Sequence, residues 1–156
     1  MNNPPFSISV LLATLLGGTV ALASGGGKAP PDPTYVRECG ECHAPFPARH
    51  LSAESWRAVL AGLPRHFGQD ASLDPYTAKT IEVYLAAHAG RRPTLAIEGS
   101  PRLRITETPW FRREHDEIPS RVWQSAAVKS PARCEACHQG AEQGRFSEHH
   151  VHLPKE

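Results

Sequence analysis

Apolar residues recur at helical spacing in two segments of the chain, 52–62 and 75–89. Ser52 and Asp74 stand at their starts as candidate N-caps, and Pro75 occupies a first helical position, where proline is favoured. Each pattern predicts an amphipathic helix that buries one stripe against a core. The stripes consist of Trp56, Val59, Leu60 and Leu63 in the first segment and of Ile81, Leu85 and His88 in the second.

The remaining elements are expected to be short. Further helices are predicted near residues 34–42, 120–129 and 133–138, whereas the prolines of segment 91–109 indicate an irregular link. Leu103–Thr106 is the one candidate strand, and a short pairing there would not alter the class. The sequence therefore predicts an all-α fold with long irregular connections.

The N-terminal residues 1–23 are typical of a secretory signal peptide. Phe6–Leu22 is almost wholly apolar or small, and Ala21-Leu22-Ala23 matches the small-x-small rule for cleavage. We expect a flexible leader over 24–33, which joins no core. An uncleaved membrane anchor is the alternative, although Gly17-Gly18 interrupts an apolar run that is short for a membrane span. The leader predicts a periplasmic protein.

Composition excludes some partners and indicates a small core. The chain has 156 residues, with 17 Lys and Arg against 16 Asp and Glu and a formal net charge of +1. That balance gives no reason to expect nucleic acid or an anionic membrane surface as a partner. With 12 glycines and 15 prolines, a chain of this length needs further buried apolar surface, which a large flat cofactor such as a porphyrin would supply.

All four cysteines lie in two C-x-x-C-H motifs, residues 39–43 and 134–138. This is the attachment pattern of c-type haem. Two thiols about one helical turn apart can add to the two vinyl groups of a haem, and the following histidine then lies under the iron as its proximal ligand. We therefore expect two covalently bound haem c groups, with thioethers from Cys39, Cys42, Cys134 and Cys137 and with His43 and His138 as proximal iron ligands.

Three other interpretations explain these cysteines less well. A zinc site usually keeps its two C-x-x-C pairs about 15–20 residues apart, whereas about 90 residues separate the two pairs here. A thioredoxin-like motif explains one pair and does not require the histidine. Two disulfides would suit an exported protein but leave the repeated histidine unexplained.

The second axial ligand of each iron is constrained by the methionine content. Met1 is the only methionine and would be removed with the signal peptide, so neither haem could have the His/Met ligation common in small cytochromes c. The remaining options are a second histidine, an open site for a gas or a peroxide, or a rarer ligand such as lysine.

Two further histidines have suitable surroundings for an iron ligand. His66 lies beside Phe67 on a turn after the first predicted helix, and His115 follows the aromatic pair Trp110-Phe111. We expect His66 to be the distal ligand of the first haem and His115 that of the second. A cross-over, in which each serves the other haem, stays open.

The other histidines are less suitable. His88 is interpreted as a polar helix end, where it favours the negative end of the helix dipole. His50 lies too close to His43 along the chain to reach readily round a porphyrin. The polar C-terminal tail contains the next candidates for the second haem, His149, His150 and His152.

In order and spacing, these motifs resemble the dihaem cytochrome c family of bacterial exported proteins. The resemblance implies two bis-His haems, with His66 and His115 as distal ligands, and an N-terminal part folded like a small class I cytochrome c. It also implies electron exchange with a membrane b-type cytochrome or a small oxygen-binding c-type haem protein. The chain departs from the family pattern at His88, where Asn is expected. The matching pieces, which run from about residue 39 to 154, are the two C-x-x-C-H motifs, Ser55-Trp56, His66-Phe67-Gly68, Ser72-Leu73-Asp74, Tyr84-Leu85, Arg104-Ile105-Thr106, Pro109-Trp110-Phe111 and Gly144-Arg145-Phe146.

The expected organisation is a first haem unit over 34–90, a linker over 91–109 and a short, irregular helical second haem unit over 110–156. Two nitrogen ligands on each iron predict a low-potential electron carrier that exchanges electrons with redox proteins, with no small-molecule substrate implied. The alternative is a haem enzyme or a gas-binding protein with one open iron, peroxidase-like or binding oxygen or nitric oxide.

Overall fold

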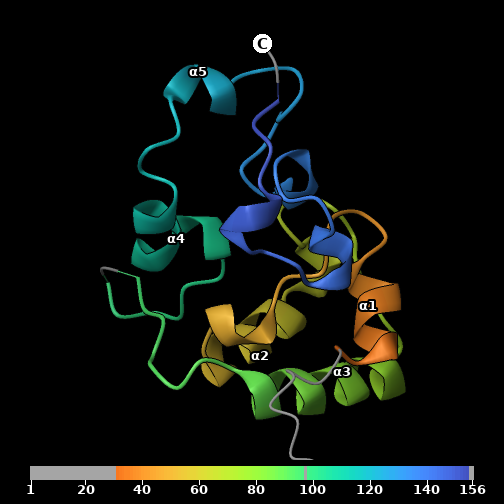
Figure 1. Ribbon diagram of the computed structural model, residues 1–156. Coiled ribbons are helices and arrows are strands. Elements are labelled where there is room, and N and C mark those ends of the chain that lie inside the picture. The colour runs from red at the N-terminus through yellow and green to blue at the C-terminus, as the bar shows by residue number, and fades with distance from the viewer. Residues whose placement is uncertain (1–30, 97, 155–156) are drawn as a thin grey trace, which may run out of the picture.

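The computed structural model describes residues 31–96 and 98–154, so the predicted signal peptide and most of the predicted leader lie outside the described residues. The described chain is helical, with β-type pairing confined to isolated bridges (Figure 1). The predicted all-α class is confirmed. The α-helices are α1 (Pro33–Cys39), α2 (Ala53–Ala61), α3 (Pro75–His88), α4 (Pro109–Glu114) and α5 (Ser120–Trp123). The 3-10 helices are η1 (Ala48–His50), η2 (Leu63–Arg65), η3 (Ile105–Glu107), η4 (Cys134–Ala136), η5 (Ala141–Gln143) and η6 (Glu148–His150).

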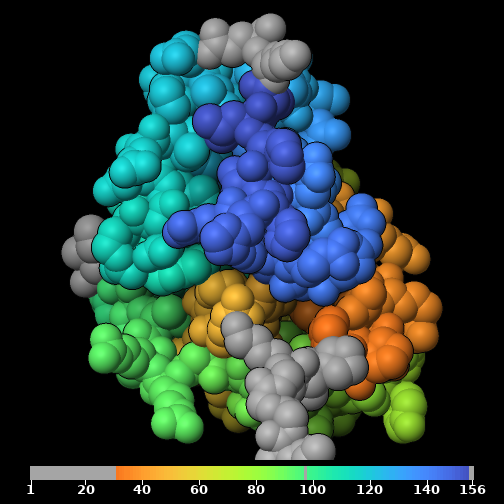
Figure 2. Space-filling model, viewed as in Figure 1, coloured from red at the N-terminus to blue at the C-terminus, as the bar shows by residue number. Residues whose placement is uncertain are grey.

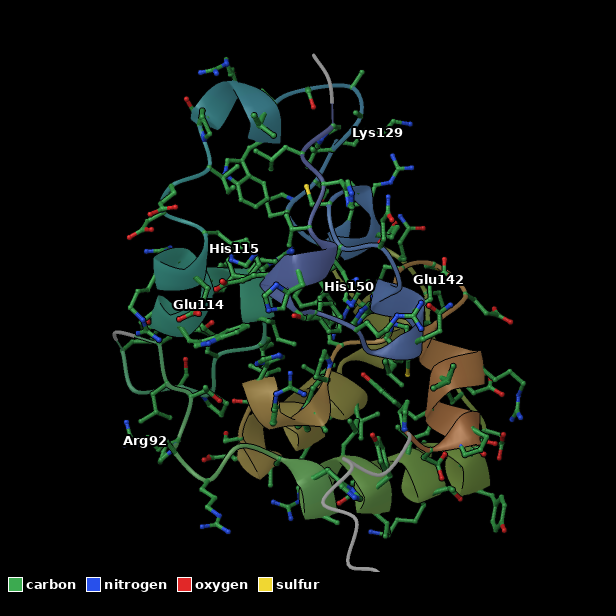
Figure 3. The ribbon with its side chains drawn as sticks, in the orientation of Figure 1. Arg92, Glu114, His115, Lys129, Glu142 and His150 are labelled. Carbon is green, nitrogen blue, oxygen red and sulfur yellow. The ribbon has the colours of Figure 1, made fainter. Side chains whose placement is uncertain are left out.

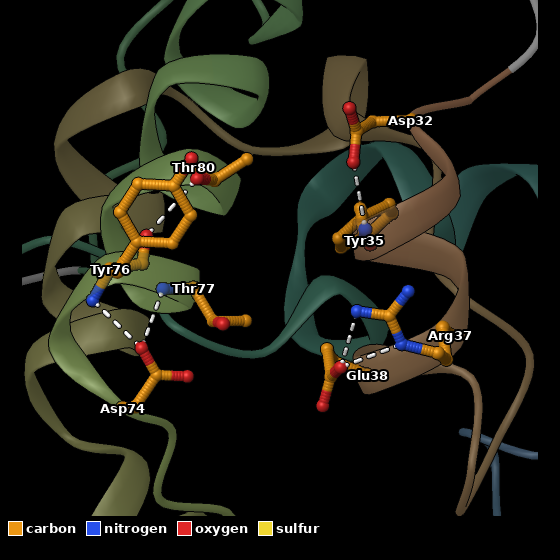
Figure 4. A network of polar contacts seen from close by, with 8 residues as sticks. All are labelled: Asp32, Tyr35, Arg37, Glu38, Asp74, Tyr76, Thr77 and Thr80. Atoms are coloured by element: carbon orange, nitrogen blue, oxygen red, sulfur yellow. Dashed lines mark hydrogen bonds and ion pairs between the residues drawn. The ribbon is translucent and has the colours of Figure 1, made fainter.

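Aspartate side chains begin two of the helices (Figure 4). Asp74 accepts hydrogen bonds from the backbone N–H groups of Tyr76 and Thr77, both at 3.0 Å, and thereby caps α3 as predicted. Asp32 accepts the N–H of Tyr35 at 3.0 Å. The first helix thus starts at Pro33, inside the segment expected to be a flexible leader. Both caps satisfy N–H groups that have no partner within the helix.

The main core lies where α1, α2 and α3 meet. Tyr35 and Trp56 are buried there with their rings edge to face, 6.5 Å between centroids. The Tyr35 hydroxyl donates to the carbonyl of Phe46 at 2.6 Å, and the Trp56 indole N–H donates to that of Ala48 at 2.7 Å. Buried polar atoms on both aromatic rings are therefore paired. The core cluster consists of Tyr35, Ala48, Leu51, Trp56, Ile81, Leu85 and Ile105.

The second half of the chain wraps a smaller set of buried residues. The C-terminal segment runs back through the middle of the molecule, with α4 and α5 to its left in the view of Figure 1 and the core helices below it. Backbone hydrogen bonds fix this segment, from Gln139 N–H to the His150 carbonyl at 3.1 Å and from His152 N–H to the Cys137 carbonyl at 2.9 Å. In Figure 2 it covers the centre of that face. The buried residues of this half are Thr108, Phe111, Val122, Val128 and Ala141.

The prediction of a helix over 120–129 is wrong beyond the first turn. The structure has a helix only over Ser120–Trp123, and the backbone N–H of Val128 then turns back to the Ser125 carbonyl at 3.2 Å. Val122 and Val128 are both buried, at 6% and 1% exposure. Residues six apart point about 120° away from each other on a continuous helix. A break between them therefore lets both side chains enter the interior.

Two other predicted elements differ from the structure. Leu103–Thr106 is not a strand, because the carbonyl of Ile105 accepts local hydrogen bonds from both the backbone N–H and the side chain of Thr108, at 3.0 and 2.7 Å. The helix expected over 133–138 is reduced to the 3-10 helix η4. Its continuation is prevented by the pairing of residues 137 and 139 with the C-terminal segment. None of the helices within 31–96 and 98–154 is long and apolar enough to cross a membrane.

Candidate haem sites

The first C-x-x-C-H motif lies at the end of α1. Cys39 is the last residue of the helix and Gly40 follows as its cap. A Cβ at Gly40 would collide with the carbonyl of Val36, so only glycine allows the chain to turn this closely. The helix therefore ends three residues before the predicted limit, and Cys42 and His43 lie in the bend that follows it.

His43 is half-buried and has one fixed ring nitrogen. Its Nδ1 lies 2.9 Å from the backbone carbonyl of Ala44. A carbonyl can only accept, so Nδ1 carries the proton in this hydrogen bond and Nε2 keeps a free lone pair. That tautomer is the one in which a histidine binds a metal through Nε2 while a second contact orients the ring.

His66 faces His43 across the first site. Their ring centroids are 6.5 Å apart and their planes differ by 26°. A metal–imidazole nitrogen bond of about 2.0–2.1 Å places two rings that share one metal with centroids roughly 6.3 Å apart. The observed separation is close to this value. The residues therefore fit a haem iron held between them.

The turn that carries His66 has an unusual backbone. Phe67 and Gly68 both have positive φ, 51° and 99°, and the Gln69 N–H donates to the His66 carbonyl at 3.1 Å. Two consecutive positive φ angles are characteristic of a type I′ turn. Glycine adopts such angles readily, but phenylalanine does so only at a cost, and such strain is concentrated at functional sites. The cost at Phe67 is consistent with a turn shaped to present His66.

The second C-x-x-C-H motif forms the short helix η4 and faces His115 at the end of α4. The rings of His115 and His138 have centroids 6.1 Å apart with planes at 74°. Nδ1 of His115 lies 2.8 Å from the Phe111 carbonyl, which leaves its Nε2 free. Phe111 also stacks on the His115 ring at 4.1 Å. The second pair thus repeats the metal-spanning separation of the first.

A cavity of about 870 Å³ adjoins the second motif, within the range of ligand sites. Figure 3 shows His115 near the middle of the molecule, where α4 approaches the C-terminal segment. The Nδ1 atom of His138 is buried and has no hydrogen-bond partner among the described residues, which is rare outside sites built around a further group. The walls include Phe46, Phe111, His115, Val122, Trp123, Val128, Cys134, Cys137, His138 and Phe146.

Burial favours the neutral form of one candidate ligand in each site. Desolvation, followed by the charge of His43, lowers the pKa of His66, and desolvation followed by His115 lowers that of His138. Neutral imidazole is the form that binds a metal. Burial raises the pKa of the Cys39 and Cys134 thiols to about 11. Both thiols therefore stay protonated at neutral pH until they react.

The remaining histidines lie outside these two pairs. His88 is exposed at the end of α3, as predicted, with Nδ1 2.8 Å from the Tyr84 carbonyl. His50 stacks on the indole of Trp110 at 4.0 Å. The tail histidines His149, His150 and His152 are exposed.

Sequence reasoning missed several aromatic neighbours of the candidate ligands. Phe46 packs against His43 with 4.8 Å between ring centroids, and Trp123 lies 5.9 Å from His115. Aromatic residues near each C-x-x-C-H motif along the chain are a usable signal for Phe46 but not for Trp123. Trp123 lies in α5 and reaches the site through contacts with Phe111 and His115, at 6.1 and 5.9 Å between ring centroids.

Two attachment motifs, each with a second histidine at metal-spanning distance, define a c-type cytochrome with two haems. The family model for dihaem cytochrome c matches residues 35–146, and the chain belongs to this family. It binds two c-type haems, as predicted from the cysteine motifs. A comparison with curated proteins gave no match.

Solved structures of dihaem cytochromes c are similar over most of the chain. A dihaem cytochrome type c from Shewanella baltica is 42% identical with a TM-score of 0.67, covering 78% of this chain and 92% of that one. The protein DHC purified from Rhodobacter sphaeroides is 46% identical with a TM-score of 0.63, covering 74% of this chain and 96% of that one. These likenesses agree with the predicted family and cofactors.

Proposed function

We propose that this protein is a periplasmic electron carrier in which each haem iron binds two histidines, His43 with His66 and His138 with His115. A bound c-type haem supplies a one-electron couple between ferric and ferrous iron. The spacing of the imidazole rings, 6.5 Å in one pair and 6.1 Å in the other, is the observation that carries the proposal. The same spacing favours ligation within each half of the chain over the cross-over arrangement.

In this proposal the cysteines attach the haems to the chain, and the histidines bind the haem irons. Cys39 and Cys42 form the thioethers of the first haem, and Cys134 and Cys137 form those of the second. Backbone carbonyls orient His43 and His115 through Nδ1, at 2.9 and 2.8 Å. Ligands fixed in this way need to move little when an electron arrives, which suits a carrier. Since methionine ligation raises the reduction potential, paired histidines predict potentials below those of a Met-ligated cytochrome c.

A haem enzyme or gas-binding protein remains the competing function, and it requires one iron with an open position. The separations of the imidazole rings support this proposal over an open position, because His66 and His115 lie close enough to His43 and His138 to share a metal with them. We therefore infer no catalytic activity. The partners we propose are redox proteins, either a membrane b-type cytochrome or a small oxygen-binding c-type haem protein.

Substitution of the distal histidines tests the proposal. His66→Ala and His115→Ala should each convert one of the two haems to high spin in the EPR spectrum, while covalent haem stays at two per chain. His88→Ala is the matched control, because His88 is exposed on α3, and it should leave both haems low-spin. A low-spin spectrum in either distal variant would contradict that ligand assignment.

The proposed periplasmic location rests on the predicted signal peptide and has its own test. When the full-length chain is expressed, the protein recovered in the periplasmic fraction should lack residues 1–23, as judged by mass spectrometry. Recovery in the membrane fraction with those residues intact would favour the uncleaved anchor instead.

A further inference from the structure

Arg104 belongs to the segment between the two haem motifs but contacts the first site. Its guanidinium carbon lies 3.9 Å from the centroid of the Phe67 ring, a cation–π arrangement. The Phe67 ring in turn packs on His66, with 4.7 Å between their centroids. A residue far along the chain thus covers the turn that carries the proposed distal ligand.

This contact supports a turn that needs support. Phe67 has φ of 51°, costly for a residue with a bulky side chain, and its side chain is 45% exposed. One backbone hydrogen bond, from Gln69 to His66, closes the turn. The guanidinium of Arg104 lies over the ring, and we expect this contact to limit the movement of Phe67 and His66 away from the site.

Arg104 also brings a positive charge to the region of the haem sites. Its carboxylate partner, Glu107, lies 3.5 Å away in an exposed ion pair, which neutralises it only weakly. Arg104 also lines a smaller cavity together with His115 and Trp123. One cation therefore contacts the neighbour of the first proposed distal ligand and shares a cavity with the second.

We propose that Arg104 is a positioning residue of the first haem site, which holds the 66–69 turn closed over the iron and favours the reduced state by its positive charge. The inference rests on the proposed ligation by His66. Because ferrous haem carries one positive charge fewer than ferric haem, a nearby cation stabilises the reduced form. The stack and the charge are separate properties of the same side chain, and substitution can separate them.

Three variants of the holoprotein test this inference. Arg104→Gln removes charge and stack, and should shift the one-electron equilibrium of the first haem toward the oxidised form by up to about tenfold, which is about 59 mV. After reduction, it should also let carbon monoxide bind at that haem, which the wild-type protein does not do. Arg104→Lys keeps the charge but cannot stack as a plane, so the potential should return toward that of the wild type while carbon monoxide still binds. Arg102→Gln is the control, because it removes a neighbouring cation whose Nε donates to the Leu95 carbonyl. It should change neither the potential of the first haem nor its carbon monoxide binding.

Each outcome has a distinct meaning. An unchanged potential together with no carbon monoxide binding in Arg104→Gln would overturn the inference, provided that His66→Ala still gives a high-spin first haem. If His66→Ala stays low-spin, the ligation itself is wrong. Equal shifts in Arg102→Gln and Arg104→Gln would mean that surface charge in general, rather than this residue, sets the potential, and would also overturn the inference.

Discussion

The imidazole of His50 lies face to face with the indole of Trp110, with ring centroids 4.0 Å apart and planes within 18°. His50 ends the 3-10 helix η1 beside the main core, and Trp110 lies in the first turn of α4. Both residues line the cavity next to the second C-x-x-C-H motif. The pair therefore joins the first half of the chain to the second at the edge of the second haem site.

This stack predicts a measurable coupling between the two halves. His50→Ala and Trp110→Ala should each lower the free energy of unfolding, and a double-mutant cycle should give a coupling of about 0.5–1.5 kcal/mol, the range for aromatic pairs. Denaturant unfolding followed by far-UV circular dichroism measures it. Both variants should keep two low-spin haems. Strictly additive effects would show that the stack contributes nothing.

Thr108 is the buried cap that positions α4 and thereby His115. Its hydroxyl donates to the Ile105 carbonyl at 2.7 Å and accepts the Phe111 N–H at 3.1 Å. Thr108→Val keeps the shape but removes both bonds, and should cost about 1–2 kcal/mol of stability. Chemical denaturation gives the value. Thr108→Ser retains the hydroxyl and should lose less, so an equal loss in both variants would refute the capping role.

The C-terminal histidines offer a test of the alternative ligands for the second haem. His149, His150 and His152 are exposed, and the segment is held by backbone rather than side-chain bonds to the second motif. Simultaneous replacement of all three by Gln should therefore leave the EPR spectrum of the oxidised protein unchanged. Conversion of one haem to high spin would move the distal ligand from His115 to the tail.

Asp74 makes the stability of α3 depend on pH. Hydrogen bonds from Thr77, and then Tyr76, lower the pKa of its carboxyl (Figure 4). A lowered native pKa means that the ionised cap stabilises the fold above the ordinary carboxyl pKa of about 3.9, and that this stabilisation is lost as the pH falls through the lower native value. Asp74→Asn should thus be less stable than wild type at pH 6, with the gap closing in acid.

Unfolding midpoints of Asp74→Asn and the wild-type protein, measured from pH 2 to pH 7, give this difference in stability. Asp116→Asn, which changes an exposed carboxylate outside any helix, is the control. Its unfolding midpoint should change with pH in parallel with that of the wild type. A constant difference between Asp74→Asn and wild type across the whole range would mean that the charge of the cap is not involved.

Local sequence signals were sufficient to predict helices and the cofactor where those signals agreed with the packing of the folded chain. The Ser52 cap and the Asp74-Pro75 start predicted helices within a residue of those observed, Ala53–Ala61 and Pro75–His88. The C-x-x-C-H motifs determined the cofactor, because no other chemistry needs that pattern twice. In each case the residues that decide the outcome lie within one or two turns of each other.

Tertiary interactions decided the rest. Helix α4 went unpredicted although Thr108 and Pro109 form a proper start, because the predicted irregular link was extended to Pro109 and no helix was expected over 110–114. The early end of α5 follows from the burial of Val128, which only the folded chain reveals. Likewise the contact of Arg104 with Phe67 joins segments far apart in sequence, and no local pattern indicates it.

The central claim is that both irons are bound by two histidines, and low-temperature EPR of the oxidised wild-type protein tests it most directly, together with carbon monoxide addition after reduction. The account predicts two low-spin ferric signals, no high-spin signal and no optical shift with carbon monoxide at either haem. A high-spin signal, or a carbon monoxide shift at one haem, would contradict bis-His ligation and favour a gas-binding or catalytic iron.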